Sequence, residues 1–150
     1  MSRGFSQRSK TALVGVHPKL VAVVTDALQT SPYDFMVVQG VRSREQCMVN
    51  YGKGRTASQI AKWGIPAAYA KPGEAKVTWL ANPFNSLHCV QADGYGHAVD
   101  LLPEPYDWKD IAHFKAVAAA CKAAAAHRGV RIVWGGDWSS TKDYPHIELA

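Results

Sequence analysis

The sequence lacks the features of membrane proteins and of disulfide-stabilised secreted proteins. No apolar run approaches the roughly 20 residues that span a bilayer, so membrane insertion is not expected. The segment from Met1 to Lys10 is polar and has no apolar signal core. The three cysteines, Cys47, Cys89 and Cys121, include no CxxC pair, and their odd number predicts reduced thiols rather than a disulfide framework.

The composition is that of a globular protein, with 47% hydrophobic and 19% charged residues among 150. No repeat or low-complexity linker divides the chain, so we expect residues 1–150 to form a single domain. The net charge of +5 favours a polyanionic partner. The basic residues are scattered, however, without a run or interleaved aromatic residues, so nucleic-acid binding is not expected.

Hydrophobic periodicity and turn residues predict the order of helices and strands. Helices are predicted at 10–29 with Ser9 as N-cap and an interruption at Pro18, at 44–51 after Ser43, at 57–63, and at 108–127 between Asp107 and Gly129. Strands are predicted at 35–39, 77–80, 98–102, 131–134 and 146–149. This order predicts an α+β fold, with a small, mostly antiparallel sheet and helices packed on one side.

Three residues have the chemistry of a catalytic zinc site. His88, Asp100 and His146 can supply three ligands and leave a position for water. Asp143, three residues before His146, can take a proton from that water, and Arg42 can stabilise developing negative charge. The spacing alone is a weak signal, because such combinations are common and the stronger HExxH motif is absent.

Several ordered motifs are more specific. They are Ser86-Leu87-His88, Gly96-His97-Ala98-Val99-Asp100, and Trp134-Gly135-Gly136-Asp137-Trp138 followed by Asp143-Tyr144-Pro145-His146. Together with the segment from Ser31 to Arg42 and Gly54-Arg55-Thr56, they resemble the zinc D-alanyl-D-alanine carboxypeptidases and phage L-alanyl-D-glutamate endopeptidases. This group shares its fold with the hedgehog signalling domain. The resemblance extends from about Pro18 to Leu149. The segment from Ser31 to Arg42 is similar to phage endolysins of this group.

The resemblance implies the roles of individual residues. His88, Asp100 and His146 would bind one Zn²⁺ per chain. Asp143 would act as general base and then as general acid, and Arg42 would steady the substrate carbonyl and its tetrahedral intermediate. Apart from the resemblance, four residues near these positions are candidates for supporting the site or the substrate: Ser86, Asp137, Trp138 and Glu148. Asp137 could equally be a structural turn residue, and Trp138 could be a core residue.

The resemblance also implies an activity. The expected protein is a monomeric endolysin that hydrolyses the L-alanyl-D-glutamate bond of the peptidoglycan stem peptide and lyses the host cell. It would be made in the host cytoplasm and reach periplasmic peptidoglycan after membrane permeabilisation. With no separate cell-wall-binding domain, wall binding would rest on the catalytic domain and its positive charge. The alternatives are a D-alanyl-D-alanine carboxypeptidase or dipeptidase, and a non-catalytic zinc-stabilised binding domain.

One feature departs from the family pattern. The glycine of Gly-x-Ala-x-Asp usually follows the first histidine by about three positions, whereas Gly96 follows His88 by eight. The extra residues, within Cys89 to Tyr95, are expected to form a loop beside the site. His97 is then a competing ligand, but on a strand it would point to the face opposite Asp100, which favours His88.

Overall fold

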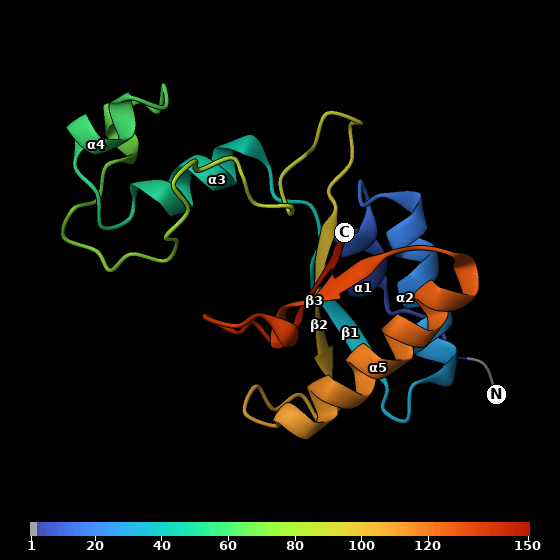
Figure 1. Cartoon of the computed structure of the whole chain (residues 1–150). Coiled ribbons are helices and arrows are strands. Elements are labelled where there is room, and N and C mark those ends of the chain that lie inside the picture. The colour runs from blue at the N-terminus through green and yellow to red at the C-terminus, as the bar shows by residue number, and fades with distance from the viewer. Residues whose placement is uncertain (1–2) are drawn as a thin grey trace.

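The computed structural model describes residues 3–150 as an α+β fold around one antiparallel sheet (Figure 1). The helices are α1 (Gln7–Leu13), α2 (Pro18–Thr30), α3 (Arg44–Gly52), α4 (Ala57–Ala61) and α5 (Ile111–Arg128), with short 3-10 turns at Ala67–Tyr69 and Gly135–Asp137. The strands are β1 (Phe35–Gln39), β2 (Ala98–Pro103), β3 (Ile132–Trp134) and β4 (His146–Leu149). They lie in the order β1-β2-β4-β3, and each neighbouring pair is antiparallel. The predicted fold class is confirmed.

Helices α1, α2 and α5 lie on one side of the sheet and enclose the main core (Figure 1). Leu20, Val23 and Val24 of α2 have no exposed surface, and they belong to the same buried cluster as Val37 of β1 and Val99 of β2. Each such side chain contributes about 1.5–3 kcal/mol through burial. No helix in residues 3–150 has the length and apolarity that a membrane span requires.

Residues between β1 and β2 form a lobe around α3 and α4, set apart from the three core helices (Figure 1). It has a small cluster of its own, formed by Tyr51, Ile60 and Ile65. Buried Arg55 places its guanidinium 3.9 Å from the Tyr51 ring centroid and donates to the backbone oxygens of Tyr51 and Thr78, both at 2.9 Å. These contacts join the lobe to the extended segment that returns toward β2. The single-domain organisation stays a prediction.

The N-terminal helical region differs from the prediction. Ser6, not Ser9, caps α1, and Ser9 is buried within the helix, where its hydroxyl accepts the Val37 N–H at 3.0 Å. Pro18 does not interrupt a helix but begins α2, with His17 as N-cap. Proline suits the first helical position because it has no N–H to leave unpaired and its φ is already helical.

The predictions for residues 77–80 and for the start of the last helix were also wrong. Residues 77–80 are not a strand: Val77 and Trp79 are 53% and 75% exposed, and no described strand pairs with them. Their apolar alternation does not show whether a neighbouring strand is free to pair. Helix α5 begins at Ile111 with Asp110 as N-cap, whereas Asp107 accepts the Lys109 N–H in the preceding turn.

The prediction of reduced thiols is contradicted by a disulfide between Cys47 and Cys89. A backbone bridge between Arg42 and Cys89 brings Cys89 beside the beginning of α3, where Cys47 lies one turn after the N-cap. Cys121 is free and fully buried in α5, and burial raises the pKa of its thiol to about 12. Counting cysteines does not reveal that two of them, 42 residues apart, meet in space.

Candidate metal centre

Three of the predicted site residues meet at the sheet. Asp100 of β2 pairs in register with His146 of β4 on one side and with Gln39 of β1 on the other. The β1–β2 register shifts just before this position, and such a bulge redirects side chains locally. His88 comes from the loop before β2, where its carbonyl accepts the Arg42 N–H at 2.7 Å.

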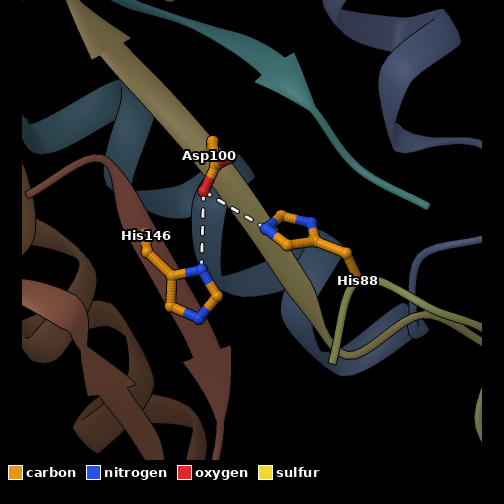
Figure 2. A group of neighbouring side chains, drawn as sticks. All are labelled: His88, Asp100 and His146. Carbon is orange, nitrogen blue, oxygen red and sulfur yellow. Dashed lines mark ion pairs between the residues drawn. The ribbon is translucent and has the colours of Figure 1, made fainter. Parts of the chain in front are cut away.

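The three side chains point toward one another (Figure 2). Asp100 Oδ1 lies 3.3 Å from His88 Nε2 and 3.5 Å from His146 Nδ1, and the three ligand atoms all lie within 4.8 Å of one another. Tetrahedral ligands at about 2.0–2.1 Å from a zinc ion are separated by about 3.3 Å. Both histidines are almost fully buried.

Hydrogen bonds on the far side of each imidazole determine which nitrogen faces the centre. His88 Nδ1 lies 2.8 Å from the Gly40 carbonyl oxygen, which can only accept, so Nδ1 carries the proton and Nε2 offers a lone pair. His146 Nε2 lies 2.7 Å from Glu148 Oε1, so in the neutral imidazole Nδ1 offers the lone pair. Such outer partners orient the imidazoles of metal sites.

The ionisable side chains of the group shift one another's pKa values. Asp100 Oδ1 is buried without a hydrogen bond, because the facing nitrogens lie at ion-pair distance and not in hydrogen-bond geometry. Burial by itself raises the pKa of Asp100, but His146 and His88 outweigh it and hold this pKa below its usual value. Burial lowers the pKa of His146, yet Asp100 and Glu148 together raise it to about 9. The donor set of two imidazoles and one carboxylate fits a Zn²⁺ ion.

Asp143 and Arg42 flank the three candidate ligands. Asp143 Oδ2 lies 4.0 Å from His146 Nδ1 in a partly exposed position. Burial, followed by the charge of Asp100, raises the pKa of Asp143, which favours a carboxyl group that both accepts and returns a proton. Arg42 is half-buried with its Nε unpaired, and burial lowers its pKa against the opposing effect of Asp100. Its guanidinium donates to Gln39 Oε1 at 3.4 Å.

These groups open onto one cleft of about 560 Å³. This volume suits a small ligand or a short peptide segment. The cleft lies between the sheet and the lobe. Its wall includes residues of α3 and of the segment at 77–80 on one side, and the three candidate ligands on the other. Its lining is Arg42, Asn50, Lys53, Val77, Thr78, Leu80, Asn85, Ser86, Leu87, His88, Asp100, Trp138, Asp143, His146 and Glu148.

The predicted supporting residues divide into two groups. Ser86 Oγ accepts the His88 N–H at 3.2 Å, Glu148 contacts His146, and the Trp138 ring lies 5.1 Å from the His146 ring. Asp137 does not take part in this arrangement: its carboxylate pairs with Lys122 at 2.6 Å on the surface. Sequence patterns did not predict that the Gly40 carbonyl contacts His88, or that Asn50 and Lys53 at the end of α3 line the cleft. No local motif marks these residues.

Residues 93–97 are tied to the connection between α1 and α2. His97 Nε2 lies 2.7 Å from Asp93 Oδ2, and His17 Nε2 lies 3.7 Å from the same oxygen. Gly96 exchanges backbone hydrogen bonds of 2.9 Å with Gly15 and His17, which tie the loop to the α1–α2 connection. The structure therefore groups His88, not His97, with Asp100 and His146.

Comparisons with known proteins match both the N-terminal and the C-terminal parts of the chain. Residues 1–62 match the phage L-alanyl-D-glutamate peptidase family, and residues 81–149 match a D-alanyl-D-alanine carboxypeptidase family. The L-alanyl-D-glutamate peptidase of Escherichia phage T5 is 31% identical over 99% of this chain and 90% of its own. The peptidoglycan L-alanyl-D-glutamate endopeptidase CwlK of Bacillus subtilis is 27% identical over 89% of this chain and 73% of its own.

A solved structure of a related protein has a similar fold. The L-Ala D-Glu endopeptidase ChiX of Serratia marcescens superposes with a TM-score of 0.62 and 28% identity, over 97% of this chain and 89% of that one. The match to the phage T5 relative spans almost the full length of both proteins. The chain therefore belongs to the family of L-alanyl-D-glutamate peptidases and is a peptidase.

Proposed function

We propose that this protein is a zinc peptidase that hydrolyses the L-alanyl-D-glutamate bond of peptidoglycan stem peptides. The observation that carries the proposal is the convergence of His88 Nε2, Asp100 Oδ1 and His146 Nδ1 on one buried point that opens onto a cleft. The names of the phage T5, CwlK and ChiX relatives support the choice of bond.

Each residue of the proposed site has its own role. His88, Asp100 and His146 would hold Zn²⁺, which when bound lowers the pKa of water toward neutrality and polarises a carbonyl group. Asp143 takes the proton of the attacking water and returns it to the departing amine of D-glutamate. Because its pKa is raised, the Asp143 carboxylate is a stronger base toward the attacking water.

Arg42 stabilises the charge that forms on the carbonyl oxygen. Arg42 lines the cleft, so its guanidinium can donate to this oxygen as negative charge develops. Glu148 and Gly40 hold the two imidazoles in the orientation that binding requires. Trp138 contributes to the cleft wall beside His146.

The biological setting is part of the proposal. The protein would act as a monomeric phage endolysin that is made in the host cytoplasm and meets peptidoglycan after the membrane is permeabilised. The phage T5 relative supports the phage setting, and the net charge of +5 supports attraction to an anionic envelope. If charge contributes, binding to isolated sacculi should weaken as salt rises; salt-independent binding would refute that contribution.

The deciding experiment is digestion of purified sacculi by the zinc-loaded protein, with mass spectrometry of the fragments. Stem peptides that begin with a free D-glutamate amine are the expected product. Loss of terminal D-alanine alone would instead support a D-alanyl-D-alanine carboxypeptidase, which the family match over residues 81–149 makes the second candidate. No cleavage by the zinc-loaded protein would overturn the enzymatic proposal.

A further inference from the structure

The wall of the cleft formed by α3 carries two polar side chains that the proposed chemistry does not use. Asn50 lies in the last turn of α3, and Lys53 is the C-cap residue of that helix. Both line the same cleft as His88, Asp100 and His146. Residues three apart at a helix end lie on neighbouring positions of one face, so an amide and an ammonium group are presented together.

The backbone around Lys53 is firmly held. The Lys71 N–H donates to the Gly52 oxygen at 2.9 Å, and the Gly54 N–H donates to the Lys71 oxygen at 2.8 Å. These two hydrogen bonds bracket Lys53 and form an isolated bridge between Lys53 and Lys71. The lysine side chain therefore extends from a fixed point on the cleft wall.

The two side chains offer donors to a ligand. Asn50 Oδ1 accepts from Gln46 Nε2 at 2.8 Å, which orients the amide and leaves its two N–H donors for another partner. Among residues 3–150, the one lysine paired with a carboxylate within 4.0 Å is Lys122. The ammonium of Lys53 is thus available to an anion in the cleft.

The charges of the cleft are unevenly distributed. Asp100, Asp143 and Glu148 place negative charge at the metal end, where half-buried Arg42 interacts with Asp100. Lys53 supplies positive charge from the α3 wall. A lysine at a helix C-terminus also complements the helix dipole, but that role does not require a neighbouring amide that faces the same cleft.

We propose that Asn50 and Lys53 form a subsite for a free carboxylate on the leaving-group side of the stem peptide. The inference rests on the proposed function. When a stem peptide continues through the γ-carboxyl of D-glutamate, the α-carboxylate of that residue is free, and a diaminopimelate in the next position adds another free carboxylate. Either carboxylate can accept charge-assisted hydrogen bonds from the ammonium and amide groups.

The test uses four synthetic peptides in which L-alanine is followed by D-glutamate or D-isoglutamine, and then by L-lysine or diaminopimelate. The zinc-loaded protein and its Lys53→Met, Lys53→Arg and Asn50→Ala variants are compared by kcat/KM for each peptide. Lys62→Met is the matched control, because Lys62 lies over the Trp63 ring outside the cleft. Unfolding temperatures of all variants verify that each remains folded.

The native protein should favour the carboxylate over its neutral counterpart by about tenfold, as expected for a hydrogen bond to a charged group. Lys53→Met should reduce this ratio to near one, Asn50→Ala should reduce it in part, and Lys53→Arg and Lys62→Met should keep it. If Lys53→Met loses the preference for D-glutamate over D-isoglutamine, the subsite binds the α-carboxylate of D-glutamate. If it loses the preference for diaminopimelate over lysine, the subsite binds the free carboxylate of diaminopimelate.

An unchanged ratio in Lys53→Met, or an equal loss of kcat/KM on all four peptides, would overturn the subsite while leaving the peptidase assignment intact. Failure of the native zinc-loaded protein to cleave any of the four peptides would instead contradict the proposed function, and the subsite with it.

Discussion

Replacement of Glu148 by alanine should weaken metal binding although Glu148 is not one of the three proposed ligands. Its Oε1 lies 2.7 Å from His146 Nε2, and this contact places the lone pair of Nδ1 toward Asp100. His146 is only 6% exposed, so water cannot readily replace the carboxylate. The imidazole would lose both its orienting partner and part of its basicity.

The expected loss is about 10–100-fold in metal affinity, which corresponds to about 1.4–2.7 kcal/mol. Glu148→Gln should lose less than Glu148→Ala, because an amide oxygen still accepts the Nε2 proton but carries no charge. Competition with a chromophoric zinc chelator at constant pH measures both affinities. Glu74→Ala, at an exposed position in the loop before 77–80, is the matched control and should bind zinc normally.

The orienting role would be refuted if Glu148→Ala bound zinc within twofold of the native protein. It would also be refuted if Glu148→Gln and Glu148→Ala lost equal affinity while both stayed folded, because the difference between them isolates the retained hydrogen bond. Circular dichroism of the metal-free variants distinguishes a lost ligand orientation from a lost fold.

Three other outcomes follow from the same structure. Asp143→Asn should lower kcat by about 10²–10⁴ with zinc affinity nearly unchanged, as measured by peptide hydrolysis and calorimetry; a normal kcat would remove Asp143 from proton transfer. In the metal-free fold the pKa of His146 is raised from 6.5 to about 9, so this group stabilises the fold below pH 6.5 and the contribution disappears as pH rises through about 9. Zinc must displace that proton, so its affinity should rise with pH up to about 9, and calorimetry at pH 7 in buffers of different ionisation enthalpy should detect about one released proton; none would contradict the assignment. Reduction of the Cys47–Cys89 disulfide, which spans 42 residues, should lower the free energy of unfolding by up to about 4 kcal/mol. An identical denaturation midpoint with and without reductant would contradict this stabilisation.

Much of the architecture is local enough to be predicted from sequence. The strands at 35–39 and 98–102, the helix after Ser43 and the end of the last helix at Gly129 were predicted because alternation, capping and a left-handed glycine each act within a few residues. The errors at Ser9 and at residues 77–80 have a common cause. A buried serine and an unpaired extended segment are decided by neighbours that the local sequence does not contain.

The site also combines features that local sequence predicts with features that depend on distant parts of the chain. Ordered motifs identified His88, Asp100 and His146 as candidates, because the residue types that bind zinc are few and their order along the chain is informative. The sequence by itself thus determined which residues could carry the chemistry, together with the class of fold.

Only the tertiary structure decided how those residues are used. It turned Nε2 of His88 and Nδ1 of His146 toward Asp100, through partners as distant in sequence as Gly40, which lies 48 residues from His88. It also joined two cysteines, directed Asp137 to the surface, and made α3 a wall of the cleft. The physical reason is that these contacts depend on the path of the whole chain, whereas sequence patterns report only on nearest neighbours along it.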